Sequence, residues 1–198
     1  TKGKTTTTHM IKTVLESAGH VVGLVGTNGI TIRDTHMETA NTTPESYELQ
    51  KAFAQMVEAG CDTALMEVSS QGLKMERVGG IFFDVGVFTN ISPDHIGPGE
   101  HADFEEYLHY KGLLFQRCRH GVVNADDEHL EGLLEGHTCD LVTFGFSPKA
   151  DYRTDDYTLL RSRDFLGAAF HISGAEDLDV RVNMPGRFSV YNALCAVA

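Results

Sequence analysis

Short apolar runs alternate with helix-type segments along most of this chain, and two of the runs end in polar clusters. Residues 62–70 read DTALMEVSS and residues 82–92 read FFDVGVFTNIS. Such runs are typical of strands buried on both faces of a parallel sheet, so we expect the strands at 62–68 and 83–89 to pair in parallel. Helix-type segments lie before and after them, at about 4–18, 44–60 and 103–118. The alternation predicts an α/β fold with a mostly parallel sheet flanked by helices.

The pattern changes between residues 152 and 183. Stretches such as GAAFHIS and DLDVRVN alternate apolar and polar residues, which predicts a small antiparallel meander near the C-terminal end. Upstream, residues 41–45 carry two helix-start patterns. Thr42 with Glu45 fits a capping box, and Thr43 before Pro44 fits an N-cap followed by proline at the first helical position.

The charge balance limits the partners that the chain can bind. Its 198 residues include 16 Lys+Arg against 28 Asp+Glu, a net charge of −12, which argues against a nucleic-acid coat. A phosphate ligand would therefore need local attraction from a helix N-terminus, fixed cations or a divalent metal. No apolar run reaches the roughly 18–20 residues of a membrane span. The start, TKGKTTTTHM, lacks a signal-peptide apolar region, and four scattered cysteines suit a reducing, cytoplasmic setting.

Gly3-Lys4-Thr5-Thr6 matches the second half of a Walker A motif at the start of a helix. In that motif backbone N–H groups and the lysine hold phosphate oxygens, and the Ser/Thr hydroxyl holds Mg²⁺. The motif indicates a P-loop NTPase-like arrangement of the sheet. In isolation, a capped surface helix with an exposed lysine is an equal alternative.

Three further polar side chains follow the predicted strands or lie in the next helix. Glu67 ends the first apolar run, where a carboxylate can hold a metal beyond the sheet edge; alternatively it caps a helix that begins near Gly72. His95 follows the second run as a candidate metal ligand or a solvated loop histidine. Lys111 lies in an acidic helix, where its simplest partner is Tyr107 at i−4.

Six motifs occur in a fixed order: GKTT at 3–6, NTTPE at 41–45, EVSS at 67–70, FTNISPDH at 88–95, YxxYK at 107–111 and PGRFSVYNALCA at 185–196. The series resembles the central domain of the Mur ligases, ATP-dependent amide ligases of peptidoglycan precursor synthesis. NTTPE followed by EVSSQGL is most similar to the members that add the third amino acid. The resemblance covers essentially all 198 residues, which would make residues 1–198 one central ATP-binding domain, truncated at both ends.

The resemblance implies roles for individual residues. Lys4 would contact the β- and γ-phosphates, while Thr5 and Glu67 would bind one Mg²⁺. His95 and an N-carbamylated Lys111 would bind a second Mg²⁺, so that Lys4, His95 and Lys111 form the catalytic set. The nucleotide would be held by Lys2, Gly3, Lys4, Thr5, Thr6 and Asn192, and the UDP-muramoyl-dipeptide by Asn41, Thr42, Thr43, Ser69 and Arg77.

The implied reaction joins UDP-N-acetylmuramoyl-L-alanyl-D-glutamate to an amino acid of the L-lysine or meso-diaminopimelate type, through an acyl phosphate formed from ATP. An N-terminal UDP-binding domain and a C-terminal amino-acid-binding domain would flank this one, which would be inactive alone. The chain departs from the family at three places: the absent first glycine of the phosphate loop, Met75, and the longer loop at 96–101. The alternatives are a folylpolyglutamate synthetase-like ligase and a non-catalytic Mur-like binding module.

Overall fold

The computed structural model describes residues 2–94 and 96–198, and these residues form two compact units. One unit comprises the described parts of 4–81 and 95–114, and the other comprises the remaining described residues. Within the described residues, no helix has the length and apolar character that a membrane crossing requires. His95 lies outside the described residues, so its predicted role as a metal ligand has no structural counterpart below.

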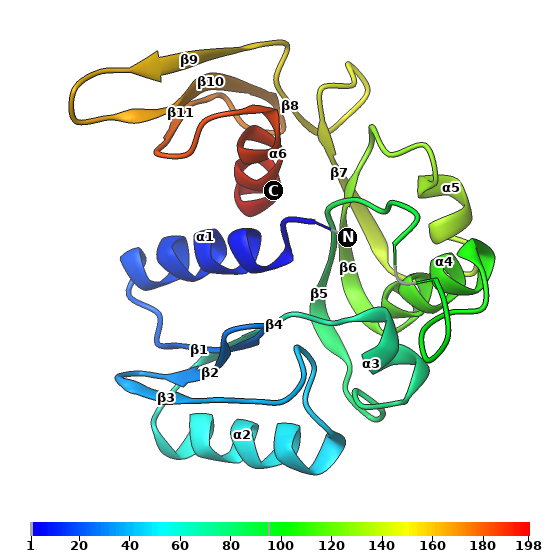
Figure 1. Cartoon of the computed structure of the whole chain (residues 1–198). Helices are drawn as coiled ribbons and strands as arrows, with labels where there is room; N and C mark the ends of the chain where they lie inside the picture. The colour runs from blue at the N-terminus through cyan, green and yellow to red at the C-terminus, as the bar shows by residue number, and fades with distance from the viewer. Residues whose placement is uncertain (1, 95) are drawn as a thin grey trace. The chain divides into compact units, whose positions relative to one another are not determined.

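The first unit is built on a four-stranded sheet with the order β3-β2-β1-β4. Its strands are β1 (Val22–Gly26), β2 (Gly29–Ile32), β3 (Thr35–Met37) and β4 (Thr63–Met66). β1 pairs in parallel with β4 and in antiparallel with β2, through a tight hairpin in which Gly26 lies opposite Gly29. Helices α1 (Lys4–Ser17) and α2 (Ser46–Glu58) cover opposite faces of this sheet (Figure 1). Every residue of β1 is buried, which makes this strand the centre of the core.

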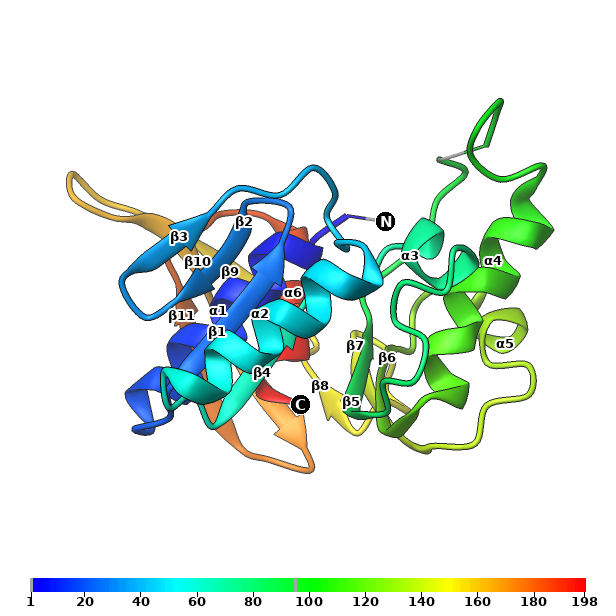
Figure 2. The same cartoon turned by 90° about the horizontal axis from the view of Figure 1, so that it is seen from below.

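Two shorter helices complete the first unit. α3 (Ser70–Lys74) follows β4, and α4 (Phe104–Gly112) packs beside α3 (Figure 2). Asp103 starts α4, because its carboxylate accepts a hydrogen bond from the Glu106 N–H at 2.8 Å. The 3₁₀ helix η1 (Leu113–Gln116) continues from the end of α4.

The second unit is built on a sheet of seven strands with the order β11-β10-β8-β7-β6-β5, in which β9 also pairs with β10. The strands are β5 (Phe83–Phe88), β6 (Cys118–Asn124), β7 (Asp140–Gly145), β8 (Tyr152–Arg153), β9 (Tyr157–Arg161), β10 (Leu166–Gly174) and β11 (Leu178–Val182). β5 to β8 pair in parallel, and β10 pairs in antiparallel with β8, β9 and β11. Helices α5 (Leu130–Leu133) and α6 (Arg187–Val197) belong to this unit. The predicted α/β class and antiparallel meander are therefore confirmed.

Two expectations from the sequence are wrong. Among the described residues β4 pairs only with β1 and β5 only with β6, so the strands at 62–68 and 83–89 are not partners. An apolar run shows that a strand exists without showing whether it is central: Val85 on β5 is 51% exposed. The cap prediction also fails, since α2 begins after Glu45, whose side chain makes no cap hydrogen bond.

Candidate active site

The Glu67 carboxylate is the centre of the predicted site in the first unit. It is only 3% exposed and accepts three hydrogen bonds. The Thr27 N–H donates to Oε1 at 2.9 Å, while the Thr27 and Thr5 hydroxyls donate to Oε2 at 3.1 and 2.9 Å. Gly26 makes room for it, because a Cβ there would lie 2.3 Å from Glu67 Oε1. Glu67 therefore belongs to a polar cluster with Thr5 and does not cap the helix near Gly72; Ser69 does so instead.

A second set of hydrogen bonds joins the NTTPE segment to the end of β4. The fully buried Thr43 hydroxyl donates to the Glu67 carbonyl at 3.0 Å and accepts from the Ser69 N–H at 2.9 Å. The Arg77 guanidinium donates to the Thr43 carbonyl at 3.3 Å and pairs with the Glu45 carboxylate at 2.8 Å. Thr43, which was expected to cap α2, instead links the NTTPE segment to the end of β4.

Thr42 adds a further contact between the NTTPE segment and the residues around the Glu67 carboxylate. Its hydroxyl lies 3.2 Å from the Thr27 hydroxyl, which itself bonds to Glu67. The structure thus brings six of the predicted residues into one continuous network: Thr5, Thr42, Thr43, Glu67, Ser69 and Arg77.

The second unit contains another group of predicted residues, around a pocket of about 160 Å³. Gly3 has φ of +92°, and a Cβ at this position would lie 2.4 Å from Asn192 Oδ1. The Lys2 backbone is held by Asn90, whose amide accepts from the Lys2 N–H at 2.9 Å and donates to its carbonyl at 2.7 Å. The pocket is lined by Lys2, Gly3, Thr89, Asn90, Asn124, Asp126, Asp127, Phe188, Tyr191 and Asn192.

Two residues that line this pocket, Asp126 and Tyr191, are hydrogen-bonded to each other and to neighbouring groups. Asp126 accepts hydrogen bonds from the Phe146 N–H at 2.6 Å and from the Tyr191 hydroxyl at 2.7 Å. Burial and then the Asp126 carboxylate raise the pKa of Tyr191 to about 12, so its hydroxyl stays protonated. The Arg187 guanidinium lies 4.4 Å from the Phe146 ring centroid, within cation–π range.

Comparison with known proteins identifies the family. The model of the Mur ligase middle domain matches residues 1–198. The chain belongs to the Mur ligase middle-domain family.

Individual relatives agree with this assignment. The chain is 42% identical over 200 residues to UDP-N-acetylmuramoyl-L-alanyl-D-glutamate–2,6-diaminopimelate ligase 1 of Clostridium acetobutylicum, and all of it aligns to 40% of that protein. It is 38% identical over 205 residues to the Halalkalibacterium halodurans ligase of that name, again entirely, over 41% of that protein. This Mur ligase middle domain thus spans about 40% of the length of the curated relatives it matches.

Solved structures support the same fold. The structure of a UDP-N-acetylmuramoyl-L-alanyl-D-glutamate–2,6-diaminopimelate ligase superposes with a TM-score of 0.87 at 28% identity, covering all of this chain and 40% of that one. Folylpolyglutamate synthetase from Lactobacillus casei gives a TM-score of 0.65 at 17% identity, covering all of this chain and 54% of that one. At that identity the synthetase shares the fold alone.

Four other predicted residues of the Mur ligase middle domain lie outside the hydrogen-bond network around Glu67 and do not line the 160 Å³ pocket. Lys4 is the first residue of α1, and Thr6 is half-buried in its first turn. Asn41 accepts a hydrogen bond at its carbonyl from the Thr39 hydroxyl at 3.1 Å. Lys111 places its Nζ 5.1 Å from the centroid of the Tyr107 ring, so the simple i−4 contact exists.

Sequence reasoning missed three residues of this arrangement. Gly26 lies at the end of β1, and Thr27 lies in the hairpin turn that follows it. A buried strand that ends in Gly-Thr is the signal that could have found them. His101 is fully buried, whereas the loop at 96–101 that contains it was noted only for its length.

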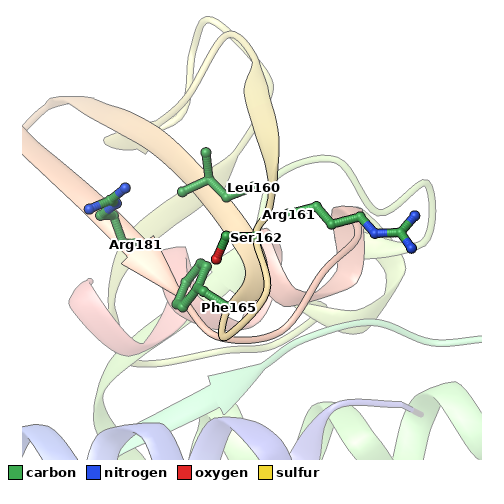
Figure 3. A pocket seen from close by; sticks show the side chains of 5 residues that line it. All are labelled: Leu160, Arg161, Ser162, Phe165 and Arg181. Atoms are coloured by element: carbon green, nitrogen blue, oxygen red, sulfur yellow. The ribbon is translucent and has the colours of Figure 1, made fainter.

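A larger pocket, of about 440 Å³, lies on the meander (Figure 3). It is lined by Leu160, Arg161, Ser162, Phe165 and Arg181. None of the predicted site residues line it. In Figure 3 Leu160, Phe165 and Ser162 gather at one side of the β9–β10 ribbon, whereas the Arg161 guanidinium extends away from them.

Proposed function

We propose that this middle domain is the ATP-using part of a ligase that joins diaminopimelate to UDP-N-acetylmuramoyl-L-alanyl-D-glutamate in peptidoglycan precursor synthesis in the cytoplasm. The names of the relatives support this substrate pair. The proposal applies to the ligase as its gene encodes it, because the chain spans about 40% of those relatives. We further propose that the remaining length of such a ligase supplies UDP-binding and amino-acid-binding domains.

One observation carries the proposal: the network that runs from Thr5 through Glu67 and Thr43 to Arg77. It links a phosphate-loop threonine to a buried carboxylate and then to a basic side chain. An ATP-dependent ligase needs a phosphate-binding group, a metal-binding carboxylate and a substrate-binding cation close together, because the phosphoryl donor and the acceptor carboxylate must meet. A non-catalytic binding module needs no buried carboxylate beside a phosphate-loop hydroxyl.

The residues around Glu67 fit a bound Mg²⁺. Magnesium prefers octahedral oxygen ligands at about 2.0–2.1 Å, which places neighbouring ligands about 2.9 Å apart. Thr5 Oγ1 and Glu67 Oε2 are separated by 2.9 Å. The described residues contain no group of three or more His, Cys, Asp or Glu side chains able to hold a metal. Mg²⁺ binds through one or two carboxylates together with phosphate and water, so Glu67 and Thr5 would be its protein ligands here.

The domain's own residues would bind and orient the nucleotide. α1 is 14 residues long, begins at Lys4 and carries no acidic residue in its first turn, so its N-terminus favours an anion. Lys4, the first residue of that helix, would hold the β- and γ-phosphates. The bound metal would neutralise phosphate charge, which the net charge of −12 makes necessary.

The reaction has two steps with balanced products. The γ-phosphoryl group of ATP passes to the D-glutamate carboxylate, giving ADP and an acyl phosphate. The amine of the third amino acid attacks the acyl carbon, loses a proton and displaces phosphate, forming the amide. In this scheme Arg77 and Ser69 orient the dipeptide, while His95 and a carbamylated Lys111 would hold a second Mg²⁺.

The test is turnover by the ligase as its gene encodes it. Phosphate release is measured with ATP, Mg²⁺ and the UDP-muramoyl-dipeptide, adding meso-diaminopimelate or L-lysine. We expect turnover with diaminopimelate, a loss of at least 100-fold in Lys4→Met, and an unchanged rate in Lys51→Met, which alters an exposed lysine on α2. No phosphate release with either amino acid would instead support a non-catalytic binding module. Activity on folylpolyglutamate precursors would support the synthetase alternative.

A further inference from the structure

His101 lies at the contact between α3 and α4 and is fully buried. Its Nε2 lies 2.8 Å from the Ser70 hydroxyl oxygen, and its Nδ1 lies 3.7 Å from Glu106 Oε2. The Ser70 hydroxyl fixes one edge of the buried ring, while the Glu106 carboxylate lies near the other edge, beyond hydrogen-bond distance.

The proton positions on the ring follow from its surroundings. The Ala102 N–H donates to the Glu106 carboxylate at 2.6 Å, and the Lys74 ammonium lies 3.0 Å from it. These contacts, the Ala102 bond first, hold the pKa of Glu106 below its usual range. An ionised Glu106 favours the proton on Nδ1, so Nε2 is left to accept a hydrogen bond from the Ser70 hydroxyl.

On the α3 side, His101 reaches the turn that the site uses. Ser70 is the first residue of α3 and directly follows Ser69. Ser69 accepts from the Gly72 N–H at 3.0 Å through its hydroxyl, and its own N–H donates to Thr43. A shift of the Ser70 hydroxyl would therefore move the Ser69 and Thr43 contacts with it.

On the α4 side, His101 packs against aromatic rings. The centroids of the His101 and Tyr107 rings are 5.1 Å apart, and that of Tyr110 is 5.8 Å away. The Lys111 Nζ lies over the same Tyr107 ring. The His101 ring thus supports the aromatic surface on which the Lys111 side chain rests.

We propose that His101 is a positioning residue that fixes the Ser69–Ser70 turn to the Tyr107 face of α4. The proposal rests on the proposed ligase function, in which Ser69 in this turn orients the dipeptide and a carbamylated Lys111 would hold a second Mg²⁺. His101 itself contacts neither the dipeptide nor the Mg²⁺. It holds the Ser69–Ser70 turn and α4 in fixed positions, so its loss should change the KM for the dipeptide and kcat more than the KM for ATP.

Two variants separate the two contacts of His101. His101→Gln places an amide near the position of Nε2 and can keep the Ser70 hydrogen bond, but it removes the ring. His101→Phe keeps a ring against Tyr107 but leaves the buried Ser70 hydroxyl without this partner. His9→Gln, at an exposed position of α1, is the matched control.

Steady-state kinetics of the full ligase give the first readout. We expect His101→Phe to raise the KM for the UDP-muramoyl-dipeptide at least tenfold, the size expected for one lost buried hydrogen bond. We expect His101→Gln to keep that KM within about threefold and to lower kcat at least tenfold. The KM for ATP should stay within about threefold in both. Equal changes in both KM values, or no change beyond His9→Gln, would overturn the proposal.

Amide hydrogen exchange gives a readout that needs no activity. In His101→Phe we expect the Ser69 and Gly72 amides to exchange at least tenfold faster, while amides of α2 keep their wild-type rates. Uniform acceleration across the unit would mean that His101 is only a core residue and would overturn the proposal. If wild-type ligase shows no turnover, the proposed function fails, and the exchange pattern still decides whether His101 holds the turn.

Discussion

Replacing Glu67 by glutamine separates a metal-binding role from a structural one. The carboxylate is nearly inaccessible and is held by one backbone N–H and two hydroxyls. Glutamine has the same length, and its carbonyl can still accept the Thr27 N–H while the two hydroxyls rotate to accept from its amide. The change therefore keeps the hydrogen bonds and removes a buried negative charge.

The magnitudes follow from those contacts. Since no partner of Glu67 is lost, we expect Glu67→Gln to change the free energy of unfolding of the ligand-free protein by no more than about 1 kcal/mol. Glu67→Ala leaves the Thr27 N–H and the partly exposed Thr5 and Thr27 hydroxyls without their acceptor and should cost about 1–3 kcal/mol. A ligand present at 100 times its Kd adds about 2.7 kcal/mol to wild-type stability, and Glu67→Gln should lose most of that gain.

Urea unfolding followed by circular dichroism, with and without Mg²⁺ and a non-hydrolysable ATP analogue, measures both quantities. Glu48→Gln, at an exposed position of α2, controls for loss of an acidic side chain. Retention of the full ligand-dependent stabilisation in Glu67→Gln would refute the metal assignment. Destabilisation of the ligand-free protein by about 3 kcal/mol or more would show that the carboxylate serves the fold.

Three further changes have defined outcomes. Thr43→Val removes the hydroxyl that bonds to the Glu67 carbonyl and Ser69 N–H, and should cost about 1–3 kcal/mol in urea unfolding, whereas Thr43→Ser should cost less than 1. Gly26→Ala should displace the Glu67 carboxylate, costing about 1–3 kcal/mol and abolishing Mg²⁺-dependent stabilisation in the same assay. Hydrogen bonding to Asp179 raises the pKa of His171, so this contact stabilises fully below about pH 6.5 and is lost as pH rises through the raised value. The urea midpoint of His171→Gln should depend less on pH between 5.5 and 8.5 than that of wild type.

The sequence located most elements because the local signals agree with the observed structure. The Gly3–Thr6 segment begins α1, and the period-two stretches after residue 152 form antiparallel ladders around β10. Strand neighbours were not predictable, because apolar runs look alike whether a strand is central, as β1 is, or at an edge, as β5 is. Pairing depends on contacts between residues far apart in sequence.

The site was predictable only where a motif carries it. Thr5 and Glu67 were named from separate motifs, and the 2.9 Å bond between them joins positions 62 residues apart. Thr27 donates to the same carboxylate, but it lies outside the six motifs and was not named from the sequence. His101 was not singled out from the sequence, because its burial arises from the packing of α3 and α4 and is not visible in a polar loop sequence.

The failure of the cap prediction at α2 is itself informative about the site. An N-cap hydrogen bond contributes about 1 kcal/mol, and Thr43 stands where a local rule would use it. The hydroxyl instead bonds to β4 and Ser69, and the Glu45 carboxylate pairs with Arg77. A segment that gives up local helix stability for contacts with distant loops is under a constraint other than helix formation. The same contacts lead directly to Glu67 and Thr5, so we propose that this constraint is the geometry of the proposed site.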